Sequence, residues 1–246
     1  MKKTLLVFVL DESGSMQNIA STTMDGFNEY VDSLKPHGNA VSISLVTFNS
    51  MGINHIFTDN PIQSVPKLST FNYHPNALTP LYDAVGRAIK DTETILVKRT
   101  DKPQVLFVIM TDGLENDSKE YNRQKVFDLI NSKPKDTWQF VFLGANQDSW
   151  DEGEKIGMQV GNTRNYVTDS HGVARGFGAT IVASACYLTS AAPGSGFYNS
   201  VKEADVDVYE AKILSRGGDT SDRTTEGPIS GMGGGPKKGR KGFTRR

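Results

Sequence analysis

The sequence is poor in cysteine, in long apolar runs and in excess charge, and each shortage excludes a class of protein. Cys186 is its single cysteine, so a scaffold held together by intrachain disulfides is excluded. No stretch approaches the roughly 18 apolar residues of a membrane-spanning helix. The 27 basic and 28 acidic residues give a net charge of −1, which argues against a globally basic nucleic-acid-binding protein.

The first residues imitate a secretory signal peptide, with Lys2 and Lys3 ahead of the apolar run Leu5–Leu10. A signal peptide would continue into a small-residue cleavage site, whereas this run leads directly into the polar segment 11–15. We therefore interpret the run as a buried strand. The single cysteine and the lack of a recognisable signal lead us to expect a cytoplasmic protein.

The near-zero net charge conceals two unlike parts. Residues 217–246 hold seven basic and three acidic residues and nine glycines, so this tail carries +4 and residues 1–216 carry −5. The tail has almost no large apolar side chains, and we expect it to be disordered on its own. Its basic end, Lys237–Arg246, is either a solubilising end or a contact for nucleic acid or an acidic surface.

Strand and helix signals alternate before the tail. Continuous apolar runs at 5–10, 105–110 and 140–143 are typical of buried parallel strands, and short strands are expected at 41–48 and 165–167. Residues 53–58 follow too closely for a crossover helix, which predicts an antiparallel edge strand. Apolar spacing predicts helices within 27–34, 81–89, 126–130, 150–156 and 173–188.

This alternation predicts an α/β fold, doubly wound, with a mostly parallel central sheet, one antiparallel edge strand and helices on both faces. We expect the domain to span residues 1–190. A partly helical extension over 191–216 and the Gly-rich tail over 217–246 would follow it.

Polar residues follow the predicted strands at the edge where ligands gather in open α/β sheets. Asp11, Ser13 and Ser15 follow the first strand, Asp112 follows the strand at 105–110, and Thr79 precedes the helix at 81–89. Carboxylates and hydroxyls are hard oxygen donors, which suit Mg²⁺, Mn²⁺ or Ca²⁺ better than zinc or copper.

The same five residues resemble the metal-ion-dependent adhesion site of von Willebrand factor type A (VWA) domains. The Asp11-x-Ser13-x-Ser15 motif, the distant Thr79 and the later Asp112 fill all five family positions. The resemblance covers roughly residues 3–190, and the segment 142–148 is similar to small stand-alone VWA proteins of bacteria and phages. If a phage encodes the chain, we expect it in the host cytoplasm.

The resemblance implies a function. In the family, the serines and the threonine contact the metal directly, while the aspartates act mostly through water. A carboxylate from a partner protein fills the remaining position, so we expect a Mg²⁺-dependent (or Mn²⁺- or Ca²⁺-dependent) protein-binding module, not an enzyme and not a membrane protein.

Four further residues are candidates for the rim of this site: Glu12, Gly113, Glu115 and Asn116. We interpret Glu12 and Glu115 as solvated loop acids that add negative potential near the metal. Asn116 is either a turn residue or part of the surface that faces the partner.

Two alternatives remain open. The first is an assembly subunit that uses the fold for packing. The second is a metal-dependent phosphotransferase, because residues 111–117 imitate an acidic motif of haloacid-dehalogenase-type phosphatases and Asp11 could be their nucleophile. That chemistry normally uses a second carboxylate two residues later as general acid, and Ser13 occupies its place.

Overall fold

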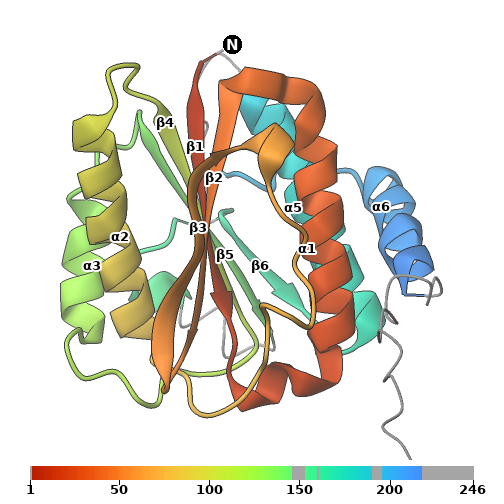
Figure 1. Cartoon of the computed structure of the whole chain (residues 1–246), viewed down its shortest axis with the longest axis horizontal. Helices are drawn as coiled ribbons and strands as arrows, with labels where there is room; N and C mark the ends of the chain where they lie inside the picture. The colour runs from red at the N-terminus through yellow and green to blue at the C-terminus, as the bar shows by residue number, and fades with distance from the viewer. Residues whose placement is uncertain (1, 146–152, 160, 190–195, 218–246) are drawn as a thin grey trace, which may run out of the picture.

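The computed structural model describes residues 2–145, 153–159, 161–189 and 196–217, and these form a six-stranded sheet in the order β3-β2-β1-β4-β5-β6 (Figure 1). All neighbouring strands are parallel except β2 and β3, which are antiparallel. The mostly parallel sheet with an antiparallel edge strand is therefore confirmed. The strands are β1 (Thr4–Asp11), β2 (Val41–Asn49), β3 (Gly52–Pro61), β4 (Gln104–Thr111), β5 (Trp138–Ala145) and β6 (Thr163–Tyr166).

Helices cover both faces of the sheet, as predicted. In Figure 1, α2 (Leu81–Lys98) and α3 (Arg123–Asn131) lie on one face, and α1 (Ala20–Leu34) and α5 (Ser170–Thr189) lie on the other. Short 3₁₀ helices occur at η1 (Gly14–Ile19), η2 (Lys35–Ala40) and η3 (Ile62–Ser64). None of the helices in the described ranges combines the length and the apolar character needed to cross a bilayer.

A hydrophobic core lies on each face of the sheet, between the sheet and its helices. Strands β1, β4 and β5 contribute side chains to both cores and are therefore buried along their whole length. On the α1–α5 face, the ring of Phe8 packs edge-on against that of Phe27, with 5.3 Å between the ring centroids, and stacks on that of Phe177, with 6.0 Å between the centroids. A Cβ on Gly26 of α1 would lie 2.3 Å from the ring of Phe177. The absence of a side chain there lets α1 and α5 approach closely.

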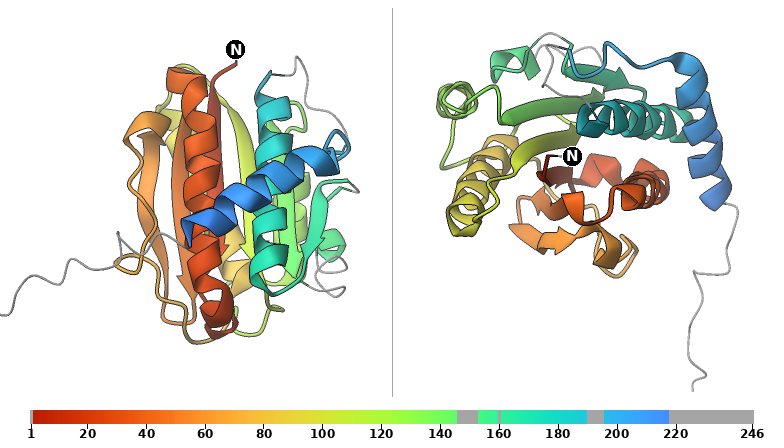
Figure 2. Two further views of the ribbon diagram at one scale, coloured as in Figure 1. Left: turned by 90° about the vertical axis from the view of Figure 1, so that its right-hand side faces the viewer. Right: turned by 90° about the horizontal axis from the view of Figure 1, so that it is seen from above.

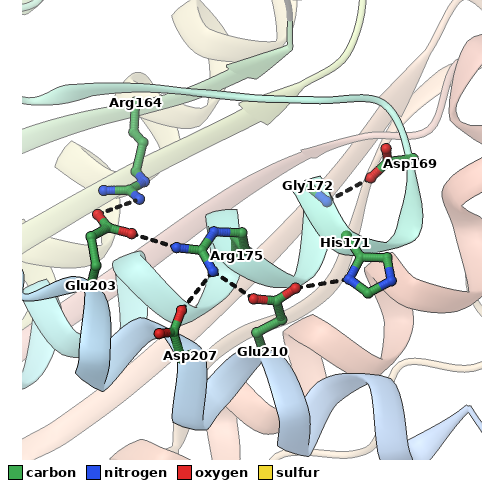
Figure 3. A network of polar contacts seen from close by, with 8 residues as sticks. All are labelled: Arg164, Asp169, His171, Gly172, Arg175, Glu203, Asp207 and Glu210. Atoms are coloured by element: carbon green, nitrogen blue, oxygen red, sulfur yellow. Dashed lines mark hydrogen bonds and ion pairs between the residues drawn. The ribbon is translucent and has the colours of Figure 1, made fainter.

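A last helix, α6 (Glu203–Arg216), crosses the outer side of α5 and α1 (Figure 2). It buries Val206 and Ile213 completely. Its charged side chains form a network with α5 and β6, in which Arg175 donates to Glu203, Asp207 and Glu210 (Figure 3). Arg164 also donates to Glu203, and His171 pairs with Glu210.

Parts of several predictions, among them residues 191–195 of the expected extension, lie outside the described residues. Residues 150–152 of the helix expected at 150–156 are among them, while residues 153–155 are helical. Nearly all of the Gly-rich tail, residues 218–246, is also outside. Its predicted disorder and its contacts stay predictions.

Candidate metal site

Three loops meet at the carboxyl end of the sheet, at the lower end of the strands in Figure 1. The loop after β1 is tied to β2 because Glu12 N donates to Phe48 O at 2.8 Å. It is tied to the loop before α2 because Asn76 N donates to Glu12 O at 2.9 Å and Gly14 N donates to Ala77 O at 3.0 Å. These backbone bonds fix the segment that carries Asp11, Ser13 and Ser15.

A chain of hydrogen bonds links the predicted residues of this segment to the end of β4. Ser13 N donates to Asp11 Oδ1 at 2.7 Å. The Oγ atoms of Ser13 and Ser15 lie 3.1 Å apart, and Ser15 Oγ donates to Asp112 Oδ1 at 2.6 Å. Residues 97 positions apart in the sequence therefore share one polar cluster.

The fifth predicted residue, Thr79, joins the cluster beside Gly113. Thr79 N donates to Asn116 Oδ1 at 2.8 Å, and Asn116 N donates to Thr79 O at 3.1 Å. A Cβ on Gly113 would lie 3.4 Å from Thr79 Oγ1 and 3.6 Å from Ser15 Oγ, so both hydroxyls border the space beside this glycine. The structure thus brings all five predicted residues together.

One carboxylate of the cluster, that of Asp11, is buried, and the other, that of Asp112, is partly buried. Asp11 is fully buried, and burial raises its pKa to about 6 against the hydrogen bonds from Thr111 and Ser13 that favour ionisation. Burial also raises the pKa of Asp112. In the described part of the chain, Asp11 and Asp112 accept hydrogen bonds from hydroxyl and amide donors. Neither carboxylate forms an ion pair with a basic side chain of these residues. A cation between them would supply the missing positive charge.

The chemistry of the donors fits a hard divalent cation. The described residues contain no group of three or more His, Cys, Asp or Glu side chains suited to a metal, so a cation here would depend on hydroxyl oxygens as well as on the two carboxylates. Mg²⁺ accepts such oxygen sets and commonly keeps several waters. Ser13, Ser15 and Thr79 would hold it, with Asp11 and Asp112 orienting hydroxyls and waters.

The interpretation of Glu12 and Glu115 as solvated acids is wrong. Glu12 is only 6% exposed, and its Oε1 accepts from His74 N at 2.5 Å, which fixes the loop before α2. Glu115 turns inward and accepts from backbone N atoms of Tyr82 and Ser118. Both carboxylates are used to satisfy buried or partly buried amides, which local sequence does not reveal.

Three residues that the sequence analysis missed also border the site. Thr111 Oγ1 donates to Asp11 Oδ2 at 2.6 Å, and Tyr73 Oη donates to Asp11 O at 2.7 Å. The buried hydroxyl of Tyr166 has no hydrogen-bond partner among the described residues. Burial, together with the charges of Asp112 and Asp11, raises the pKa of Tyr166 well above its usual value.

Comparison with known proteins places the chain in a family. The family model for the von Willebrand factor type A domain matches residues 6–175. The chain belongs to the VWA domain family. VWA domains are mainly interaction and adhesion modules that generally bind protein partners and often bind a divalent cation. No curated protein matches the chain.

Solved structures support the VWA fold. Proximal thread matrix protein 1 from the mussel byssus is 18% identical with a TM-score of 0.52, over 75% of this chain and 48% of that one. The pilus adhesin SpaC from Lactobacillus rhamnosus GG is 13% identical with a TM-score of 0.54, over 76% of this chain and 31% of that one. The chain thus spans about half or less of these proteins, and at such identities the likeness concerns the fold alone.

Proposed function

We propose that this VWA domain binds a protein partner in a divalent-cation-dependent way. The cation, Mg²⁺ or alternatively Mn²⁺ or Ca²⁺, would bind at the site formed by Asp11, Ser13, Ser15, Thr79 and Asp112, and an Asp or Glu of the partner would complete its coordination. Membership of the VWA family supports this proposal, because the family is commonly involved in metal-dependent protein interaction.

One observation carries the proposal: a buried and a partly buried carboxylate converge with three hydroxyls, and no basic side chain of the described residues pairs with either carboxylate. Leaving a buried carboxylate such as that of Asp11 without a counter-charge is costly, so such a cluster suits a bound cation. Neutral hydroxyls compensate little of the charge of a divalent ion, which therefore retains affinity for an anionic ligand from outside.

The proposed domain has no catalysis of its own. A phosphotransferase that used Asp11 as nucleophile would need an acid two residues later, and Ser13 stands there with its backbone N bonded to Asp11 Oδ1. The hydroxyl of Ser13 is paired with that of Ser15, which suits a metal ligand better than a proton donor.

Affinity capture from a lysate of the native organism tests the proposal. Full-length protein is compared in Mg²⁺ and in EDTA with the variant Asp11→Ala/Ser13→Ala. The matched control, Asp136→Ala/Ser132→Ala, removes the same side-chain types from exposed positions far from the site. We expect EDTA and the site variant to abolish capture and the control to retain it. Capture that survives both treatments would overturn the proposal.

A further inference from the structure

Large apolar side chains are exposed in the loops beside the candidate metal site. The side chain of Met51 in the β2–β3 turn is 77% exposed, and those of Leu78 before α2 and Leu114 after β4 are each 51% exposed. Exposed apolar side chains that cluster around a polar centre are typical of interaction sites, whereas isolated ones need no explanation. Whether these three cluster depends on how their loops are joined.

Hydrogen bonds and close packing join the three loops. Ser50 N donates to Leu78 O at 3.0 Å, and Leu78 N donates to Ser50 Oγ at 3.1 Å, which places Met51 next to this contact. Gly113 lies against Thr79, so Leu114 and Leu78 directly adjoin a second contact. All three apolar residues are therefore at, or within one residue of, a contact that joins two of these loops. We call Met51, Leu78 and Leu114 the apolar rim.

The apolar rim is uncharged. Residues 49–53 and 75–81 contain no acidic or basic side chain. Next to Leu114, the carboxylate of Glu115 is directed to backbone amides. A loaded cation would therefore lie beside two loop segments that carry no charged side chain of their own.

We propose that the apolar rim is a docking surface for a protein segment that carries one Asp or Glu flanked by bulky apolar residues. This inference rests on the proposed function, since the cation receives the carboxylate. The flanking side chains would then cover the apolar rim and remove its surface from water, which is favourable in proportion to the area buried. A polyacidic segment fits poorly, because one cation takes one carboxylate and the neutral rim offers the others no counter-charge.

Synthetic peptides of eight residues test the inference by fluorescence anisotropy with the full chain in Mg²⁺. One peptide carries a central Glu flanked by Leu and Phe, a second carries the same Glu flanked by Ser, and a third replaces the Glu of the first with Gln. We expect the apolar-flanked Glu peptide to bind about ten-fold more tightly than the Ser-flanked one. The Gln peptide should lose binding, as should all peptides in EDTA.

Variants assign this preference to the apolar rim. Leu78→Ser/Leu114→Ser should remove the ten-fold preference while keeping the Mg²⁺-dependent rise in melting temperature, which reports an intact site. The control Val97→Ser/Val208→Ser replaces side chains that are 87% and 54% exposed on α2 and α6, and it should retain the preference. Preference that persists without Leu78 and Leu114 would overturn the inference.

The outcomes separate the inference from the proposed function. Equal, Mg²⁺-dependent binding of both Glu peptides to the unaltered chain would overturn the proposal that the apolar rim is a docking surface, and the proposed function would remain. Absence of any Mg²⁺ effect on binding and on melting temperature would overturn both. Self-association that disappears in Leu78→Ser/Leu114→Ser would assign the surface to a second copy of the chain and overturn the peptide partner.

Discussion

The acidic residues of two regions differ in how their charge is compensated. Along α6, Glu203 and Glu210 receive hydrogen bonds from Arg164, Arg175 and His171 (Figure 3), which hold the pKa of both carboxyls below the usual value. At the carboxyl end of the sheet, burial instead raises the pKa of Asp11 to about 6 and also raises that of Asp112. The first group is compensated within the chain, and the second is not.

This difference separates the acids that stabilise the fold through basic partners within the chain from those that would need a bound cation to do so. The carboxylates of α6 act as anchors, since their partners are already present on α5 and β6. Asp11 and Asp112 cost stability when ionised, and a cation would convert that cost into binding free energy.

Neutralising one acid in each region should change stability in opposite directions, and this is the largest expected effect. In EDTA at pH 7.5, Asp11→Asn should raise the free energy of unfolding by up to about 3 kcal/mol, because the pKa of Asp11 is higher in the folded than in the unfolded chain. Glu29→Gln weakens the contact by which Arg216, at the end of α6, donates to Glu29 of α1, and it should lower the free energy of unfolding by about 1–2 kcal/mol. Denaturant unfolding measures both, and a loss of stability in Asp11→Asn would contradict the contrast.

The stabilisation by Mg²⁺ should depend on pH. At pH 7.5 and a concentration 100 times the Kd, Mg²⁺ should stabilise the domain by about 2.7 kcal/mol. Since the pKa of Asp11 is raised to about 6, a proton competes with the cation below that pH, and the effect should shrink as pH falls from 7 to 5. Melting curves with Mg²⁺ and with EDTA across this range measure it. A Mg²⁺-dependent stabilisation that is equally large at pH 5 would show that Asp11 does not take part in the site.

Weakening the anchor of α6 should leave the metal site unaffected. Arg175→Gln removes a cation that pairs with Glu203, Asp207 and Glu210. We expect about 1 kcal/mol less protection against hydrogen exchange in α6, because these pairs are partly exposed, and an unchanged Mg²⁺ effect on melting temperature. If Arg175→Gln lowered both the protection of α6 and the Mg²⁺ effect on melting temperature, the two regions would not be independent.

The smallest effect is expected at Tyr166. Its buried hydroxyl lacks a partner among the described residues, so Tyr166→Phe should raise the stability in EDTA by at most about 1 kcal/mol. Tyr73→Phe is the matched comparison, because the Tyr73 hydroxyl donates to Asp11 O, and its removal should destabilise the domain. Equal destabilisation by both substitutions would indicate that the Tyr166 hydroxyl has a partner in solution.

Much of the fold could be predicted because its signals are local. The runs at 5–10, 105–110 and 140–143 are apolar throughout, since those strands are buried on both faces, and the short gap after 48 leaves room only for a hairpin. The extent of β3 was less predictable. It runs from Gly52 to Pro61 past register shifts opposite Ile43–Val46, and such irregularities follow from pairing with β2 rather than from local sequence.

The candidate site shows the same division. Asp11, Ser13, Ser15, Thr79 and Asp112 could be predicted because each lies at the end of a strand or the start of a helix at one edge of the sheet. The roles of Glu12 and Tyr166 could not. Glu12 bonds an amide 62 residues away, and Tyr166 reaches the level of Asp112 only through the pairing of β6 with Ala145. Those contacts exist only once the loops and strands have assembled.

The proposed function requires that Asp11, Ser13, Ser15, Thr79 and Asp112 form a divalent-cation site. Anomalous diffraction from a crystal soaked in Mn²⁺ tests it most directly. We expect one strong anomalous peak within coordination distance, about 2–2.3 Å, of Ser13 Oγ and Ser15 Oγ, and its loss in Asp11→Ala/Ser13→Ala. A well-ordered site without a peak at saturating Mn²⁺, or a peak that persists in the double variant, would contradict it.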